Sequence, residues 1–338
     1  MLAYLTTLCY FSRKRKYMDH YDLIIIGAGP TGINCGIAAK QKGLRFLILE
    51  KGVLAHSIFH FPTNMTFFST SQNLEIGDVP FISHGEKPTR REALEYYRRV
   101  AEAYALPIHL YEPVMDMSPN KNSGYRLQTP KNSYLAGAVI VATGYYGTPR
   151  LLGVPGEDLP KVKHYYDEAH PYIGQKVLVI GAANSACDVA LETYYKGAEV
   201  TMAIRESRIY EKVKYWIRPN IENRIVEGSI KAYFRTQVVE ITPNRVLLQT
   251  PDGETWIEND FVLAMTGYQP DYSFLGKLGL PIGSGDEKHP IHNNETLETP
   301  LPGVYLAGVV CAGLETSKLF IENTRHHGEM IISHIQSK

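Results

Sequence analysis

The sequence predicts an α/β protein built from two Rossmann-like domains with parallel sheets, and three observations support this fold class. An apolar strand, a glycine turn and a helix start occur together at residues 22–32. The same pattern returns 154 residues later, at 176–186. Each copy is followed by a second apolar strand, at 45–50 and 199–204, so each begins a strand–helix–strand unit.

The first turn has the glycines that a bound dinucleotide requires. Residues 23–26 are all apolar, as in a parallel strand that is buried on both faces. Gly27 permits the tight turn, Gly29 leaves room for a pyrophosphate, and Gly32 lets the helix pack closely on the strand. The start of the helix offers free N–H groups to phosphate.

The strand that follows the first turn ends in an acid, Glu50. It lies 18 residues after Gly32, close to the roughly 20 expected for the acid that binds a ribose hydroxyl. The alternative is a glycine-rich turn with a coincidental acid, which the strand–turn–helix context disfavours.

The second turn is a degenerate copy in which alanine replaces two glycines, at Ala183 and Ala186. Arg205 and Arg208 follow its second strand, where an acid would favour NAD and a basic residue suits the 2′-phosphate of NADP. Arginine can grip that phosphate bidentately, so we predict NADPH. The alternative is that both arginines are solvated surface charges. The residues predicted to bind NADPH are Gly181, Ala183, Asn184, Ser185, Ala186, Arg205, Arg208, Thr266 and Gly267.

Composition limits the remaining classes of function. The 338 residues suffice for two domains, and 35 basic against 35 acidic residues give little sign of nucleic-acid binding. The four cysteines (Cys9, Cys35, Cys187 and Cys311) form neither a disulfide framework nor a metal pattern. We therefore expect a cytoplasmic protein without a metal site.

Residues 1–18 are expected to be an N-terminal extension. Mostly apolar residues 1–12 precede the basic run 13–16, the reverse of a secretory signal. The apolar stretch is shorter than the roughly 20 residues of a membrane span. A weak membrane tether is the alternative, but no stable membrane association is expected.

The order of the segments predicts one domain inserted into another. Two strands that end in Thr-Gly, at 139–144 and 261–267, follow the two nucleotide units. A Gly/Pro-rich linker covers 153–160, and a second crossing is expected near 268–271. The predicted domains are an FAD domain at 19–153 and 270–338 and an inserted NADPH domain at 154–269. Within the FAD domain, helices are predicted at 90–105 and at 316–335.

Four further stretches, at 61–71, 74–81, 164–172 and 320–328, are not generic nucleotide-binding motifs. With them the chain resembles the two-dinucleotide flavoprotein reductases, which include thioredoxin reductase. More closely, it resembles the YpdA-type family of FAD-containing, NADPH-dependent bacillithiol disulfide reductases. The residues expected to bind FAD are Gly27, Gly29, Pro30, Thr31, Gly32, Glu50, Lys51, Thr66, Phe67, Ala142, Thr143, Gly144, Gly308 and Val309.

The chain departs from these families at three places. Well-known YpdA-type members carry a cysteine directly after the proline of the first turn, where this chain has Thr31. No CxxC occurs, although thioredoxin reductase has one in its NADPH domain. Gly308 is followed by Val309 instead of the usual aspartate of the C-terminal FAD motif.

The resemblance implies hydride transfer from NADPH to FAD and then reduction of a small-molecule disulfide, in a homo-oligomer with a role in redox homeostasis. Cys35, Cys311 and His327 are the candidate catalytic residues. Buried cysteine is more often an inert apolar residue, so reduction by the flavin without a protein thiol stays open.

Two other functions share this layout. A flavin monooxygenase would carry an FxGxxxHxxx(Y/F/W) signature, but Asp158 and Pro160 occupy its first two positions ahead of His164. A ferredoxin or flavodoxin reductase would need no cysteine, but it would favour a basic docking surface that the balanced charge does not indicate.

Overall fold

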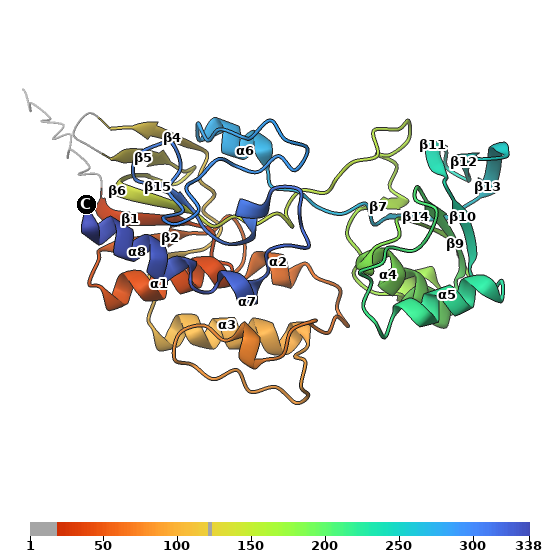
Figure 1. Cartoon of the computed structure of the whole chain (residues 1–338), viewed down its shortest axis with the longest axis horizontal. Helices are drawn as coiled ribbons and strands as arrows, with labels where there is room; N and C mark the ends of the chain where they lie inside the picture. The colour runs from red at the N-terminus through yellow and green to blue at the C-terminus, as the bar shows by residue number, and fades with distance from the viewer. Residues whose placement is uncertain (1–18, 121–123) are drawn as a thin grey trace, which may run out of the picture.

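The computed structural model describes residues 19–120 and 124–338, so Cys9 and the predicted extension at 1–18 lie outside the described residues. Figure 1 shows two bodies joined by two stretches of chain. The first body contains a seven-stranded sheet, and the second contains a five-stranded sheet and a three-stranded sheet. The predicted α/β class is confirmed, with a parallel central part in each of the two large sheets and two added antiparallel strands in the first.

The first sheet has the order β3-β2-β1-β6-β5-β4, with β15 paired to β6. Strands β3, β2, β1, β6 and β15 run parallel, whereas β4 and β5 join in antiparallel fashion. The strands are β1 His20–Ile26, β2 Phe46–Leu49, β3 Ile108–His109, β4 Asp116–Pro119, β5 Tyr125–Gln128, β6 Ser133–Val141 and β15 Val304–Leu306. Because β15 pairs with β6, the chain returns to this sheet after building the second body.

Both faces of the first sheet are covered, as its continuous apolar strands require. Leu23 and Ile25 pack on one face with Cys35 and Ile331, while Ile24 and the next alternate residue of β1 face the opposite core. Helices α1 and α8 lie side by side on the first of these faces (Figure 1). The helices of this body are α1 Pro30–Gln41, α2 His56–Phe59, η1 Gln72–Leu74, α3 Arg90–Ala103, α6 Tyr272–Lys277, η3 Gly308–Ala312, α7 Ile321–Thr324 and α8 His327–Ser337.

The second body repeats the parallel arrangement, with the strand order β10-β9-β8-β14-β7. Its helices cover one face of that sheet, and the antiparallel strands β11, β12 and β13 cover the other (Figure 1). The elements are β7 Val162–Lys163, η2 His170–Tyr172, β8 Lys176–Ile180, α4 Asn184–Tyr195, β9 Glu199–Ile204, α5 Arg218–Val226, β10 Lys231–Phe234, β11 Gln237–Ile241, β12 Arg245–Thr250, β13 Gly253–Glu258 and β14 Phe261–Ala264.

The single helix predicted at 316–335 is wrong. Two helices, α7 Ile321–Thr324 and α8 His327–Ser337, stand there instead, and residues 316–318 form a turn. The side chain of Asn323 accepts a hydrogen bond from the Phe320 N–H, so the chain enters α7 at Phe320. The Thr324 hydroxyl donates to the Phe320 carbonyl, a local bond that competes with helix continuation.

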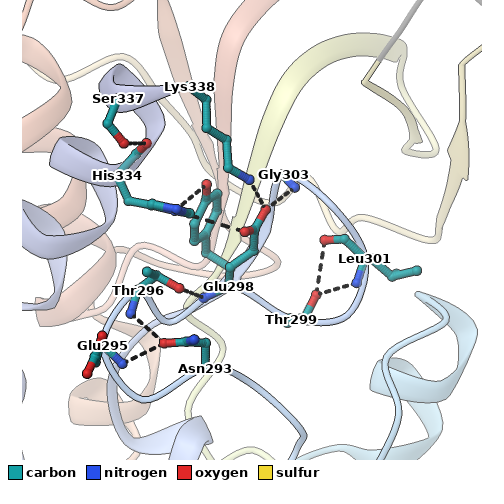
Figure 2. A network of polar contacts seen from close by, with 11 residues as sticks. Asn293, Glu295, Thr296, Glu298, Thr299, Leu301, Gly303, His334, Ser337 and Lys338 are labelled. Atoms are coloured by element: carbon teal, nitrogen blue, oxygen red, sulfur yellow. Dashed lines mark hydrogen bonds and ion pairs between the residues drawn. The ribbon is translucent and has the colours of Figure 1, made fainter.

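A polar network fixes the last helix to the strand beneath it (Figure 2). The Glu298 carboxylate accepts hydrogen bonds from the Gly303 N–H at 2.6 Å and from the Lys338 ammonium. His334 on α8 lies 4.0 Å from that carboxylate and 3.1 Å from the Tyr305 hydroxyl on β15. These contacts join the C-terminal end of α8 to β15, and α8 also packs along α1.

Among the described residues, no helix combines the length and apolarity that crossing a lipid bilayer requires.

Candidate active site

The first glycine turn is closed by backbone contacts that leave no room for side chains. Gly27 has φ +109°, and a Cβ there would lie 2.7 Å from the Ala142 carbonyl oxygen. A Cβ on Gly32 would lie 1.8 Å from the Gly27 carbonyl oxygen. The two glycines therefore let α1 and the end of β6 meet at the turn.

Gly29 differs because a Cβ there would meet no atom within 4 Å. It is the N-cap residue of α1, and no side chain caps the helix there. Pro30 has no N–H, so the free donors of the first helical turn begin at Thr31, and together with the open space at Gly29 they fit a pyrophosphate.

Glu50 is buried directly beside this turn, with 5% of its surface exposed. Its carboxylate accepts hydrogen bonds from the Ala28 N–H at 2.8 Å and the Gly52 N–H at 2.9 Å. Burial raises the pKa of Glu50, and these two bonds oppose that rise. Each oxygen keeps a free lone pair, so the carboxylate can still accept a hydroxyl of a ribose.

His56, at the start of α2, carries a buried Nδ1 atom with no hydrogen-bond partner among the described residues. Burial, together with His60 and Lys51, lowers the pKa of His56 to about 4, so the ring is neutral at pH 7. The His56 ring packs against Gly52, where a Cβ would lie 2.3 Å from the Nδ1 atom, so it adds to the packing beside Glu50.

The C-terminal motif meets the first turn at Thr31. Gly308 has φ +82°, and a Cβ there would lie 2.7 Å from the Thr31 Oγ1. The Thr31 hydroxyl lies 3.5 Å from the Thr324 hydroxyl, and Val309 packs beside Gly144. The structure thus brings together predicted residues from both ends of the chain. Thr143 and Ala142 follow β6 at the same edge of the sheet.

His327 is part of this cluster. Its Nδ1 accepts a hydrogen bond from the Gly308 N–H at 3.0 Å, so the proton of the neutral ring sits on Nε2. Burial, followed by the charges of His326 and His292, lowers the pKa of His327 to about 4. The ring therefore holds Gly308 against Thr31 and presents one N–H donor.

The predicted residues Lys51, Thr66 and Phe67 lie around this cluster in less specific ways. The Lys51 ammonium sits beside Gly147, 3.0 Å from where its Cβ would be. Phe67 is a core residue, and its N–H donates to the Pro88 carbonyl. Thr66 is exposed and forms a bridge with the segment that leads into α3.

The second glycine turn repeats the geometry of the first. Gly181 has φ +125°, and a Cβ there would lie 2.7 Å from the Met265 carbonyl oxygen and 3.2 Å from the Ala186 Cβ. Ala183 is the N-cap residue of α4, and no side chain caps it. The turn fits a second dinucleotide, with Thr266 and Gly267 at the end of the neighbouring strand β14.

A segment at 205–217 folds over this second turn. The Asn184 side chain accepts a hydrogen bond from the Lys214 N–H at 2.9 Å, and the Lys214 ammonium pairs with Asp188 at 2.9 Å. The Tyr210 N–H donates to the Ala182 carbonyl. Asn184 was predicted to bind NADPH directly, whereas here it also anchors this covering segment. Ser185 lies beside it in the first turn of α4.

Arg205 and Arg208 lie on the same segment and are exposed. Arg205 pairs with Glu206 at 3.0 Å, and Arg208 pairs with Glu211. Exposed ion pairs of this kind contribute little to stability. Both guanidinium groups can therefore leave their carboxylate partners and bind a phosphate instead.

The described cysteines are all buried thiols. Burial raises the pKa of Cys35 to about 12 and that of Cys311 to about 12. The pKa of Cys187, inside α4, is also raised by burial to about 12. Because the thiolate is the nucleophile, these surroundings do not favour thiol chemistry, and the predicted catalytic roles of Cys35 and Cys311 stay predictions.

A cavity of about 380 Å³ lies elsewhere, along the second half of α1. Asn34, Lys42, Asp78, Arg325 and Glu329 contribute its polar lining. None of the residues predicted to bind a cofactor lines it.

The segment at 61–68 connects the two bodies, and the sequence did not predict this role. It contacts the second body at three places, through Thr63, Asn64 and Phe68. Arg150, between the bodies, likewise donates to the carbonyls of Tyr268 and Leu314. The sequence hinted at this segment in one way: residues 61–71 resemble the YpdA-type family although they are not a nucleotide-binding motif.

Comparisons with known proteins agree with this geometry. Residues 24–308 match the model of the pyridine nucleotide-disulphide oxidoreductase family. The bacilliredoxin reductase Bdr of Bacillus subtilis is 44% identical over 316 residues, which cover 93% of this chain and 97% of the relative.

Two solved structures have the same fold over almost their whole length. The bacillithiol disulfide reductase Bdr (YpdA) from Staphylococcus aureus has a TM-score of 0.91 and 41% identity, covering 95% of this chain and 99% of that one. The Bacillus cereus Bdr (YpdA) has a TM-score of 0.92 and 39% identity, covering 94% and 99%. The monooxygenase and ferredoxin reductase alternatives are not favoured by these relatives.

The predicted resemblance is thereby confirmed, and with it a flavoprotein oxidoreductase that uses FAD and NADPH. The chain belongs to the pyridine nucleotide-disulphide oxidoreductases and, within them, to the bacilliredoxin reductase (Bdr, YpdA) family.

Proposed function

We propose that this enzyme uses NADPH to reduce a low-molecular-weight disulfide of the bacillithiol disulfide type. The observation that carries the proposal is the pair of glycine turns, each shaped for a dinucleotide, in a chain related to Bdr over nearly its full length. The reaction consumes one NADPH, one disulfide and one proton and yields NADP⁺ and two thiols. The flavin, when bound, accepts a hydride and passes on two electrons.

The chain's own residues bind and orient the two cofactors. The first turn and Glu50 hold the dinucleotide part of FAD, and the second turn with Arg205 and Arg208 holds NADPH. His327 keeps Gly308 in place against Thr31, next to the expected flavin site. As a neutral ring at pH 7, it donates a hydrogen bond from Nε2 and does not supply a proton.

The route of electrons to the disulfide is tested separately, because Thr31 stands where the family resemblance implies a cysteine. The test is a Cys35→Ser/Cys311→Ser double variant. If a protein thiol takes part, disulfide reduction is lost while flavin bleaching by NADPH continues. Unchanged turnover would end the thiol hypothesis and favour direct reduction of the disulfide by the flavin.

The function itself is tested by NADPH oxidation with purified, flavin-loaded protein. Bacillithiol disulfide, other small disulfides, ferredoxin and oxygen alone are assayed in parallel. We expect the fastest turnover with bacillithiol disulfide. Faster turnover with ferredoxin, or oxygen consumption that no disulfide increases, would contradict the proposal.

The proposal includes a cytoplasmic, homo-oligomeric enzyme with the domain division 19–153 and 270–338 for FAD and 154–269 for NADPH. The sheets support this division, since first-sheet strands come from 20–141 and 304–306 and second-sheet strands from 162–264. Size-exclusion chromatography with light scattering measures the oligomeric state.

A further inference from the structure

The segment at 61–68 ties the two bodies together. The Thr63 N–H donates to the Asp167 carbonyl at 2.8 Å, and the Asn64 amide donates to the Glu192 carboxylate on α4 at 3.1 Å. Asp167 follows β7, so the segment reaches two separate elements of the second body.

A third contact lies at the end of this segment and involves a cation. The Phe68 ring stacks on the Trp216 ring, with centroids 5.6 Å apart and planes inclined by 17°. The Lys87 ammonium lies 3.9 Å from the Trp216 ring centroid and 5.1 Å from that of Phe68. These distances are those of a stacked aromatic pair with a cation–π contact.

Each partner is fixed to its own body. Lys87 is held beside Phe68 because the neighbouring Pro88 carbonyl accepts the Phe67 N–H. Trp216 belongs to the segment that covers the second glycine turn, which Lys214 anchors to Asn184. The contact therefore connects the segment next to the FAD-side residues Thr66 and Phe67 with the cover of the NADPH turn.

We propose that Phe68, Lys87 and Trp216 form an aromatic–cation clasp that positions the NADPH body against the FAD body, and that they are positioning residues for hydride transfer. Phe68 is 59% exposed and Trp216 38% exposed, so the stacked pair lies at the protein surface, where the Lys87 ammonium covers both rings. The inference uses the proposed pair of cofactor sites and is independent of which disulfide is reduced.

The first test follows the clasp by fluorescence of the flavin-loaded protein. Trp216 and Trp256 are the two tryptophans of the chain, so a Trp256→Phe background leaves Trp216 as the reporter. In that background, Lys87→Ala should increase acrylamide quenching of Trp216 about twofold, and Lys87→Arg should restore the original value because arginine also makes cation–π contacts.

Lys231→Ala is the matched control, because Lys231 also lies over an aromatic ring, that of Tyr233 at 4.8 Å, but contacts no residue of the clasp. It should leave the quenching unchanged. Equal quenching in the Lys87→Ala and Lys231→Ala proteins would overturn the clasp.

The second test measures flavin bleaching by NADPH in an anaerobic single turnover with no disulfide present. Lys87→Ala and Trp216→Ala should slow the limiting rate roughly tenfold at saturating NADPH, with little change in the NADPH concentration for half-saturation. Trp216→Phe should recover most of the rate. A residue with only a structural role would lower the melting temperature or flavin content and leave the limiting rate unchanged, and that result would overturn the proposal.

Because no disulfide enters this second test, its outcome is separate from that of the proposed disulfide reduction. An enzyme that bleaches its flavin normally but reduces no disulfide would contradict the proposed function and leave the clasp standing.

Discussion

At the scale of single residues, two glycines of the first turn are needed for different reasons. Gly32→Ala would place a Cβ 1.8 Å from the Gly27 carbonyl oxygen, and overpacking of this kind costs ~1–3 kcal/mol. Gly29→Ala meets no atom within 4 Å and has φ −77°, which alanine adopts without strain. Its methyl group would instead fill the space left for the pyrophosphate.

We therefore expect Gly29→Ala to keep the melting temperature of the flavin-free protein but to lose flavin, whereas Gly32→Ala loses both. Thermal unfolding by circular dichroism and the flavin absorbance of the purified proteins measure the two effects. A Gly29→Ala protein that is as yellow as the wild type would contradict the assignment of the pyrophosphate to this turn.

His327 should make stability depend on pH. Its pKa in the folded protein is lowered to about 4 from the ordinary 6.5, so the unfolded chain binds a proton first as the pH falls. The neutral His327 ring therefore contributes fully to the free energy of unfolding above pH 6.5. As the pH falls from 6.5 to 4, the free energy of unfolding decreases by up to ~3 kcal/mol.

The matched variant is His327→Asn, whose side-chain oxygen can still accept the Gly308 N–H without titrating. Urea unfolding across this pH range should show a shallower pH dependence for the variant than for the wild type. His56 is unchanged in both proteins, so it does not affect the difference. Parallel curves would contradict the assigned environment of His327.

The spacing of residues along the chain predicted both glycine turns, because the residues that form each turn lie close together in the sequence. Gly27, Gly29 and Glu50 fall within one strand–turn–strand unit, where spacing and chemistry are coupled. The contact of Thr31 with Gly308 joins residues far apart in the chain, and no local pattern encodes it. The sequence could propose His327 only through the resemblance, and the bond to Gly308 came from the structure.

At the scale of elements, the segment 205–217 that covers the second turn should decide between NADPH and NADH. Arg205→Ala/Arg208→Ala removes the two groups that we predict to bind the 2′-phosphate, and charge-assisted hydrogen bonds contribute ~1.5–3 kcal/mol each. We expect the KM for NADPH to rise at least about tenfold. The KM for NADH, which lacks the phosphate, should change little.

The control for this prediction is Glu206→Ala/Glu211→Ala, which frees both arginines from their exposed ion pairs. It should leave the KM for NADPH unchanged or lower it slightly. Steady-state kinetics with both nucleotides provide the measurement. An equal loss with NADPH and NADH in the arginine variant would show that these arginines do not read the phosphate.

The helix with a local capping signal was predicted, and the division of the last predicted helix was not. The helix near 90–105 appears as α3, where Thr89 and Glu92 form a capping box. The helix predicted at 316–335 had suitable apolar spacing, yet Asn323 and Thr324 make local side-chain bonds that divide it. The spacing of apolar residues indicates which face of a helix is buried, but it does not show where side-chain hydrogen bonds interrupt the helix.

At the scale of the whole molecule, the two bodies have separate cores and different chain paths. The second body is one continuous stretch whose parallel sheet is covered on both faces by its own elements. The first body depends on residues from both ends of the chain, since β15 pairs with β6 and Ile331 packs on β1 residues.

This asymmetry predicts that the second body folds alone and that the N-terminal part of the first does not. A fragment covering 152–268 keeps β7 to β14 together with Leu152, Val154 and Leu159, which pack on its core. It should unfold cooperatively with temperature and retain NADPH binding by calorimetry.

A fragment covering 19–150 is the counterpart. It lacks β15 and α8, so the edge of β6 and the face that buries Leu23 and Ile25 become exposed. Exposed strand edges and apolar faces promote aggregation, so we expect an insoluble or non-cooperative product that binds no flavin. Adding 270–338 to it through a short linker in place of the second body should restore flavin binding. Failure of the joined protein, with a stable 152–268 fragment, would mean that the FAD body needs the contacts of the 61–68 segment to fold.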